Sequence, residues 1–300
     1  MTERRDRAVA LCFGEMLWDS LPTGLFPGGA PMNVAYHLHQ LGLRAAPVSA
    51  VGRDTLGDEL VRRVTAWGLD TELIGVRADK PTGLVRVKTG TGGPAYDIVE
   101  NVAWDWIELP EPPPPLVSGA KALIFGTLAQ RTEHNRKPFG RLRELCSGAL
   151  KVFDVNLRRP YDPPELAWSL AEKADVIKLN HDEAARLLGK TCSVDQLESA
   201  ARELSARTNC PRICITAGQH GAGLLLDSRW TWLAGHSIVV KDTVGAGDAF
   251  LAALVHGLLA GNKSAPDILE RARNLAEFVV AHDGATPAYI ISASGEICAP

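Results

Sequence analysis

Apolar runs of strand length alternate with longer segments of helical spacing along most of the chain. The short runs predict buried strands, and segments in which apolar residues recur every three or four positions predict helices. The predicted strands lie at 8–13, 46–51, 122–126, 152–155, 176–179, 213–216, 223–226 and 231–234, and the predicted helices at 32–41, 56–67, 138–146, 165–174, 182–188, 194–207, 246–260 and 265–282. Beyond residue 120 the two kinds follow one another as β-α-β units. This rhythm predicts an α/β fold, a three-layer αβα sandwich with a mostly parallel central sheet.

One region interrupts the rhythm. Strand-like stretches at 83–88 and 95–102 are joined by a turn rich in glycine and threonine at 89–94, which is a hairpin pattern. The proline-rich stretch 108–115 follows it and predicts a stiff, extended spacer. The sequence therefore predicts a small antiparallel flap outside the main sheet.

Composition narrows the class of protein. A chain of 300 residues with 46% hydrophobic residues can bury a substantial core, and we expect a single domain spanning 1–300. The net charge of −3 gives no electrostatic argument for binding nucleic acid or an anionic membrane. The N-terminal residues carry no apolar leader, and no apolar run approaches the ~20 residues that span a bilayer. We therefore expect a cytoplasmic globular protein.

The six cysteines support the same expectation. Several lie inside apolar, strand-like runs, and no Cys-x-x-Cys motif occurs. Cys210 and Cys214 are a weak candidate for metal binding, because no histidine lies near them in sequence. Reduced thiols in the core are the favoured interpretation.

The segment 241–250 (Lys-Asp-Thr-Val-Gly-Ala-Gly-Asp-Ala-Phe) carries the clearest candidate chemistry. Gly245 and Gly247 allow a tight turn, and the apolar helical pattern that follows directs its positive dipole end at this turn. Asp248 places a carboxylate inside the resulting anion cradle, with Ala246 between the glycines. A cradle with a built-in base suits phosphoryl transfer to an alcohol.

Two alternative roles for this segment stay open. An acid in the first turn of a helix is ordinary capping, although capping does not require two glycines that cost about 1 kcal/mol each. A Gly-x-Gly turn also opens dinucleotide-binding units. Those units place the glycines in the first βα turn, with an acid roughly 20 residues later, whereas here the glycines lie near the end of the chain.

Polar residues recur at the predicted carboxyl ends of several strands. In a parallel α/β sheet, ligands bind at this edge. Each residue taken alone could serve a turn or a cap, but their recurrence predicts one ligand site. The residues are Asp19, Asp154, Asn156, Arg158, Asn180, Thr216 and Gly218.

Two motifs resemble a known family. Residues 14–19 (Gly-Glu-Met-Leu-Trp-Asp) and 28–35 (Gly-Gly-Ala-Pro-Met-Asn-Val-Ala) are similar to the N-terminal motif of the ribokinase-like (PfkB-type) sugar kinases, and 242–250 is similar to their C-terminal motif. The chain resembles the bacterial fructokinases most. The resemblance implies transfer of the γ-phosphate of ATP, with Mg²⁺, to a primary hydroxyl of a small sugar, fructose above all. It also implies that segments 14–32 and 82–107 form a β lid over the sugar.

The resemblance assigns the catalytic and sugar-binding residues. Asp248 corresponds to the general base, and Gly245, Ala246 and Gly247 to the anion hole. The sugar-binding positions are Asp19, Gly28, Gly29 and Asn33, where Asp19 could instead be a turn residue and Asn33 a helix cap. Asp154, Asn156 and Arg158 resemble the stretch that lines the path from sugar to phosphate, and Arg158 could equally form a surface ion pair.

Trp104 lies in the lid-like region, so its ring could contact the sugar. The lid core and an interface between the lids of a homodimer account for a tryptophan there as well. The lid sequence differs from that of well-characterised fructokinases, so the sugar is the least defined part of the resemblance.

The nucleotide side follows from the same resemblance. Asn180 and Glu183 match an Asn-x-x-Glu motif that positions hydrated Mg²⁺, although the pair could also be a capping box. Lys178 could add positive charge there or be solvated. The remaining nucleotide positions are Thr216, Gly218, Gly221 and Asn274, and Asp242 and Val244 would contribute oxygens to a K⁺ site.

Several functions therefore compete. A fructose kinase is favoured, and a 2-keto-3-deoxygluconate kinase or a nucleoside kinase of the same family is the alternative. A sugar-binding regulator that lost the chemistry is the non-enzyme alternative, although Asp248 and both cradle glycines are present.

Overall fold

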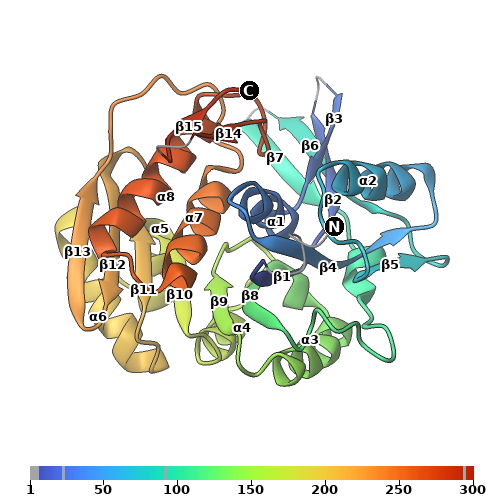
Figure 1. Ribbon diagram of the computed structural model, residues 1–300, viewed down its shortest axis with the longest axis horizontal. Coiled ribbons are helices and arrows are strands. Elements are labelled where there is room, and N and C mark those ends of the chain that lie inside the picture. Colours follow the sequence, from blue (N-terminus) through green and yellow to red (C-terminus); the bar gives the residue numbers. More distant parts are fainter. Residues whose placement is uncertain (1–6, 22–23, 91–92, 293–294) are drawn as a thin grey trace. The chain divides into compact units, whose positions relative to one another are not determined.

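The computed structural model describes residues 7–21, 24–90, 93–292 and 295–300, and only the backbone of strand residues 87–90 and 93–96. The chain forms two compact units (Figure 1). The N-terminal unit comprises the described residues up to Ala120 together with Ala129–Ser147, and the C-terminal unit comprises Lys121–Leu128 and Gly148–Pro300. Each unit has its own hydrophobic core. Whether they act as one domain stays a prediction.

The C-terminal unit is built on a mostly parallel sheet in the order β13-β12-β11-β10-β9-β8. Strands β8 to β11 pair in parallel, and β12 and β13 add an antiparallel edge. All six were predicted. Their bounds are β8 (Ala120–Gly126), β9 (Leu150–Asp154), β10 (Val176–Asn180), β11 (Ile213–Thr216), β12 (Gly221–Leu226) and β13 (Arg229–Ala234).

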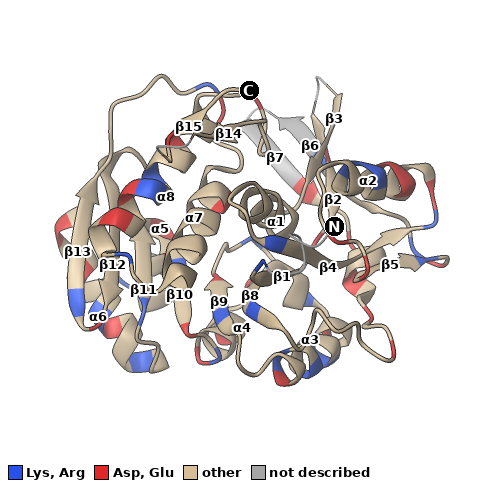
Figure 2. Ribbon diagram, in the orientation of Figure 1, with Lys and Arg blue, Asp and Glu red and all other residues tan. Residues whose placement is uncertain are grey.

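Helices cover both faces of this sheet. In Figure 1, α5 and α6 lie on one face and α7 and α8 on the other; α6 contacts β11 and β12, and α8 contacts β12 and β13. Because α7 is covered on nearly all sides, it can be apolar all round, and Figure 2 shows it as almost uncharged. The helices are α4 (Pro164–Ala171), α5 (His181–Leu188), α6 (Leu197–Thr208), α7 (Ala246–Ala260) and α8 (Ala265–Val280); the short elements are η3 (Val194–Gln196), η4 (Gly218–His220) and the pair β14 (Ile290–Ile291) and β15 (Ile297–Cys298).

The N-terminal unit contains the parallel strands β1 (Val9–Phe13), β4 (Arg44–Gly52) and β5 (Ile74–Arg77). α1 (Ala30–Gln40) packs on β1 and β4, and α2 (Thr55–Ala66) packs on β4. The predicted helix at 138–146 begins earlier, because Thr132 caps α3 (Glu133–Leu145) and Pro138 lies inside it. Strand β5 was not predicted.

A second sheet in this unit has the order β3-β2-β6-β7. The predicted hairpin is β6 (Gly83–Gly90) with β7 (Gly93–Ile98), and the tip of its turn, 91–92, lies outside the described residues. β2 (Leu17–Leu21) and β3 (Gly24–Gly28) were not predicted as strands. The predicted antiparallel hairpin is confirmed by the pairing of β6 with β7, and β2 extends this sheet by pairing with β6 in parallel. The proline-rich stretch is not uniformly extended either, since 111–112 bend and 115–119 turn.

Two general predictions can be compared with the structure. Within the described residues, no helix is both long enough and apolar enough to cross a bilayer. All six cysteines are free thiols; five of them are buried, as predicted for core residues, and Cys298 is exposed.

Candidate active site

The first turn of α7 forms the predicted cradle in the C-terminal unit. Gly245 precedes the helix in a left-handed conformation (φ 78°), and a Cβ there would lie 2.5 Å from Cα of Ala285. Only glycine fits this position. The N–H groups of the first turn have no partners within the helix; that of Ala246 donates over a long distance to the carbonyl of Thr243 (3.4 Å). The positive dipole end adds to their attraction for an anion. Gly247 is exposed and Asp248 partly exposed, so packed side chains do not cover this corner.

Lys178 lies at the same corner. It is the third residue of β10 and faces Asp154, its register partner on β9. Its Nζ is 3.0 Å from Oδ1 of Asp154, and the two side chains are 9% and 6% exposed. The same Nζ is 3.1 Å from the place where a Cβ would stand on Gly247. The ammonium therefore lies against the first turn of α7, and the alternative of a solvated Lys178 is wrong.

Three carboxylates surround this ammonium: Asp154, Glu183 and Asp248. Burial alone would lower the pKa of Lys178, but the three carboxylates outweigh it and raise that pKa. Burial raises the pKa of Glu183 against the attraction of Lys178. With three acids beside one ammonium, the cluster attracts a further cation, such as a hydrated divalent ion.

Glu183 and Asn180 form the capping box that the sequence left as an alternative. Asn180 Oδ1 accepts from the N–H of Glu183 (2.9 Å), and Glu183 Oε2 accepts from the N–H of Asn180 (2.8 Å). Glu183 Oε1 also accepts from the N–H of Leu157 (2.8 Å), which fixes the loop after β9. Since backbone donors hold both carboxylate oxygens, Glu183 suits contact with Mg²⁺ through water more than direct ligation. Among the described residues, no group of three His, Cys, Asp or Glu side chains could hold a metal ion.

The loop that Glu183 fixes carries two further predicted residues. Asn156 has a positive φ of 37°, which is uncommon for a residue other than glycine and often marks a functional loop. Arg158 is exposed, and its Nη1 donates to the carbonyl of Leu157 (3.1 Å). Within the described residues Arg158 pairs with no carboxylate, so the surface ion pair is not seen.

The nucleotide-side residues lie on several elements of the same unit. Thr216 ends β11, Gly218 has a φ of 54°, and a Cβ on Gly221 would lie 2.1 Å from the carbonyl oxygen of Leu233. Asn274 is exposed on α8. These positions fit a polar surface, and their role with a nucleotide stays a prediction.

Asp242 and Val244 lie in one turn that the Asp242 side chain stabilises. Oδ1 of Asp242 accepts from the N–H of Val244 (3.0 Å), and Oδ2 accepts from the N–H of Gly284 (3.1 Å). The carboxylate thus joins the segment before α7 to the segment after α8. The K⁺ site proposed for these residues stays a prediction.

The N-terminal unit brings the predicted sugar residues together. Asp19 on β2 lies against Gly28, since a Cβ there would stand 2.1 Å from Asp19 Oδ2. Gly29 caps α1 with φ 114°, and its Cβ would lie 2.3 Å from the carbonyl oxygen of Glu15. Asn33 is buried in the first turns of α1 and donates its N–H to the carbonyl of Gly29 (3.0 Å). A carboxylate, an amide and two glycines therefore surround one turn.

Comparison with known proteins agrees with this geometry. Residues 21–291 match the family described as pfkB family carbohydrate kinase. The chain belongs to this family. The predicted family, the carbohydrate kinase activity class and the α/β fold with a mostly parallel sheet and a smaller second sheet are thus confirmed.

Similar proteins include several fructokinases. The chain is 30% identical to the fructokinase of Klebsiella pneumoniae, over 82% of this chain and 83% of that protein. It is 28% identical to fructokinase-2 of Solanum lycopersicum, over 82% of this chain and 80% of that protein. A sugar kinase of Pyrococcus horikoshii, solved in complex with ATP, has a TM-score of 0.78 at 26% identity and covers 93% of this chain and 94% of its own. The fructokinase of Xylella fastidiosa, with a TM-score of 0.80 at 21% identity, shares the fold.

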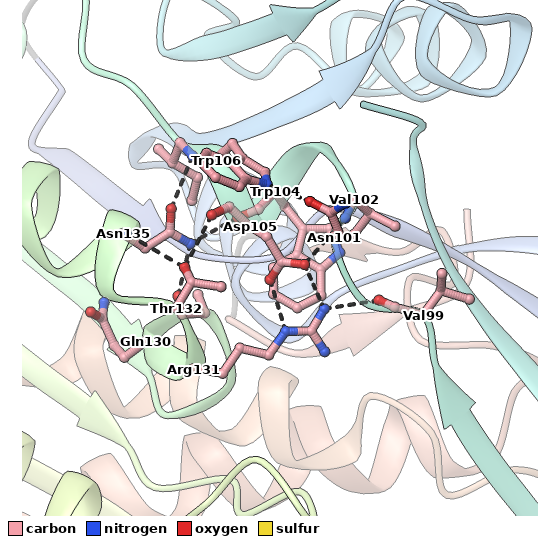
Figure 3. A network of polar contacts seen from close by, with 12 residues as sticks. Val99, Asn101, Val102, Trp104, Asp105, Trp106, Gln130, Arg131, Thr132 and Asn135 are labelled. Atoms are coloured by element: carbon pink, nitrogen blue, oxygen red, sulfur yellow. Dashed lines mark hydrogen bonds and ion pairs between the residues drawn. The ribbon is translucent and has the colours of Figure 1, made fainter. Parts of the chain in front are cut away.

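One predicted ligand residue of this kinase, Trp104, is placed differently. It is fully buried in η1 (Ala103–Trp106), with the Arg131 guanidinium 4.1 Å from the centre of its ring. Figure 3 shows the surrounding network: Arg131 donates to both oxygens of Asp105 (2.8 Å each) and to the carbonyl of Val99 (2.8 Å). Trp104 therefore belongs to a buried core in the N-terminal unit, and we leave it out of the proposed sugar site.

Sequence patterns did not reveal this network. Asn135 completes it, because its Nδ2 donates to the carbonyls of Trp104 and Ala129 (2.8 Å each). Arg131 and its neighbours belong to η2 (Leu128–Arg131) and the start of α3. An acid between two tryptophans, at Asp105, was the available signal, since a charge in an apolar segment needs a partner when buried.

Proposed function

We propose that this pfkB family kinase transfers the γ-phosphate of ATP to a primary hydroxyl of a small sugar, with fructose as its substrate. The observation that carries the proposal is the meeting of three groups at one exposed corner: the first turn of α7, the Lys178 ammonium and the Asp248 carboxylate. Fructokinases among the similar proteins support the choice of sugar.

The chemistry follows from these groups. The N–H groups of Gly245, Ala246 and Gly247 stabilise the charge that develops on the transferred phosphoryl group. Asp248 accepts the proton of the attacking hydroxyl. An aspartate with a pKa near ~4 is a weak base, but the alcohol loses its proton late in a loose transition state, so an oriented acceptor suffices. Mg²⁺ supplies charge neutralisation on the phosphates of ATP.

Other residues bind the substrates in this proposal. Asp19, Gly28, Gly29 and Asn33 hold the sugar hydroxyls, and Asn156 and Arg158 serve the path to the phosphate. Asn180 and Glu183 contact Mg²⁺ through water. The adenosine side is bound by Thr216, Gly218, Gly221 and Asn274, and K⁺ by Asp242 and Val244.

The lid, the assembly and the compartment complete the proposal. Segments 14–32 and 82–107 act as the lid over the sugar. The lids of two chains also form the interface of a homodimer, because edge strand β3 exposes Leu25 (45%) and Phe26 (39%). A Phe26→Ser variant with the same mass in solution as the wild type would contradict this interface. The proposed compartment is the cytoplasm, because free thiols are typical of proteins in that reducing environment.

A substrate panel tests the function. ADP release is measured with ATP and Mg²⁺ against ketoses, aldoses, nucleosides and sugar acids, and fructose is expected to give the highest kcat/KM. A nucleoside or 2-keto-3-deoxygluconate as best substrate would replace fructose and leave the kinase assignment standing. No ADP release with any member would overturn the assignment.

Asp248→Asn tests the base. We expect turnover to fall by ~10²–10⁴-fold, while calorimetry still detects ATP binding. Asp267→Asn, which removes an acid from the first turn of α8, is the matched control and should leave turnover unchanged. Near-normal turnover of Asp248→Asn would exclude its role as the base.

A further inference from the structure

Asp154 and Lys178 form a cross-strand pair in the middle of the C-terminal sheet. Lys178 has Asp154 as its register partner on β9 and Cys214 on β11. Burial raises the pKa of the Cys214 thiol to about 12, so this neighbour is uncharged. Of the two register partners, Asp154 alone can neutralise the ammonium.

This pairing decides where the ammonium stands. A lysine stem has four flexible bonds, and a buried ammonium without a partner carries a large desolvation cost. The contact of 3.0 Å with Asp154 fixes Nζ at 3.1 Å from the Cβ position of Gly247. Asp154 itself is 4% exposed, so little of its surface is left for a sugar. Asp154 thus acts on the first turn of α7 through Lys178.

We propose that Asp154 is a positioning residue: it holds Lys178 against the cradle so that the ammonium binds the phosphoryl group being transferred, and it does not bind the sugar. This rests on the proposed function. An ammonium has three N–H donors, so Lys178 can keep its bond to Asp154 while it donates to a phosphate oxygen. Its positive charge and the positive end of α7 then act on the same group.

Calorimetry on the 300-residue chain tests the role of Lys178 without turnover. ATP and ADP, each with Mg²⁺, are titrated into the wild type, Lys178→Met, Asp154→Asn and the double variant. Lys178→Met should weaken ATP binding about tenfold or more and ADP binding less than about threefold, because only ATP carries the phosphoryl group to be transferred. Equal losses for ATP and ADP would overturn the assignment of Lys178.

The double variant tests whether Asp154 acts through Lys178. In the Asp154→Asn background, Lys178→Met should change the ratio of ADP to ATP dissociation constants less than about threefold, because the ammonium has lost its charged hydrogen-bond partner and is attracted only by Glu183 and Asp248. A change as large as in the wild-type background would overturn the positioning role. The double variant removes the paired charges of Lys178 and Asp154 together, so Asp154 is not left buried and unpaired as it is when Lys178 alone is replaced.

Steady-state kinetics distinguish positioning from sugar binding. Asp154→Asn should lower kcat at least about tenfold with the sugar KM within about threefold of the wild type, and Asp154→Glu should restore part of kcat. A tenfold rise in sugar KM would show that Asp154 binds the sugar and would overturn the proposal.

An exposed ion pair of the same unit, Lys190 with Glu203, provides matched controls. Lys190→Met and Glu203→Gln should leave both binding ratios and kcat unchanged. If the wild type binds ATP but phosphorylates no sugar, the proposed function fails while the calorimetric cycle still tests the pair. If Lys178→Met binds ATP as the wild type does, the inference fails and the kinase assignment stands.

Discussion

Helix α7 carries a left-handed glycine at each end, and this allows a controlled test of the cradle. Gly245 has φ 78° and ψ −7°, and Gly261 has φ 70° and ψ −11°. Alanine at either position meets the same backbone strain of about 1–2 kcal/mol. Alanine also makes the unfolded chain less flexible, which offsets about 0.4–1 kcal/mol of this strain. Gly261→Ala has nothing within 4 Å of its new Cβ, so its net cost should be about 1 kcal/mol.

Gly245→Ala adds a steric overlap to the same strain. Its Cβ would stand 2.5 Å from both Cα and Cβ of Ala285 and 2.8 Å from the carbonyl oxygen of Ala285, whereas ordinary contact begins at 3.4 Å. The backbone at 285 or the start of α7 must therefore move by roughly 1 Å, at a cost of about 1–3 kcal/mol. Gly245→Ala should lose about 2–4 kcal/mol in total.

The two variants should differ in function as well as in stability. Urea unfolding measures the free energy of unfolding, and calorimetry measures ATP affinity. Gly245→Ala should lose at least about tenfold in ATP affinity, because a shift of the first turn misaligns its N–H donors, and Gly261→Ala should bind ATP as the wild type does. Equal destabilisation by the two variants, or unchanged ATP affinity of Gly245→Ala, would refute the reasoning.

Three further outcomes are expected. Arg131→Met leaves Asp105 buried without its guanidinium and should cost about 3–5 kcal/mol in urea unfolding, against less than about 1 kcal/mol for the exposed control Arg202→Met. Burial alone would raise the pKa of Asp54, but hydrogen bonds to its carboxylate lower that pKa. The stabilisation that Asp54 provides is therefore present above about pH 4 and is lost as the pH falls through the folded-state pKa. The difference in unfolding free energy between the wild type and Asp54→Asn should shrink from pH 6 to pH 3, and a constant difference would contradict this. Asp19→Ala should raise the sugar KM about tenfold or more with ATP affinity unchanged, and an unchanged KM would remove Asp19 from the sugar site.

Sequence patterns located the buried parallel strands well, because continuous apolar runs leave few other choices. They missed β2, β3 and β5 for identifiable reasons. β3 (Gly-Leu-Phe-Pro-Gly) carries a proline, which is confined to edge strands, and two glycines, which weaken a strand pattern. β5 has only four residues, one of them glycine. β2 could be identified as a strand only from the structure, where it pairs with β3 on one side and with β6 on the other.

For the candidate site too, some features could be predicted from the sequence and others appear only in the structure. Asp248 and its glycines could be predicted because they are adjacent in sequence. The pair of Lys178 with Asp154 could not, because the two residues are 24 positions apart and meet only through the register of β9 and β10. The pair of Arg131 with Asp105 has the same origin, since its members are 26 positions apart. Sequence motifs therefore predicted the charged residues of the site one by one, and only the fold showed which of them pair.

Packing within the chain excludes a Cβ at three glycines of the two motifs and leaves little room for one at the fourth. A Cβ would overlap Ala285 at Gly245, Glu15 at Gly29 and Asp19 at Gly28, and at Gly247 it would stand in tight contact with the Lys178 Nζ, 3.1 Å away. A tight turn alone is therefore weak support for a bound phosphate, because close packing already requires glycine there. Gly28 and Gly247 differ from the other two glycines, since the missing Cβ at each leaves room for a charged side chain from a neighbouring strand. Phosphate and sugar chemistry at these turns is thus favoured by the charges that the glycines admit, and less by the glycines themselves.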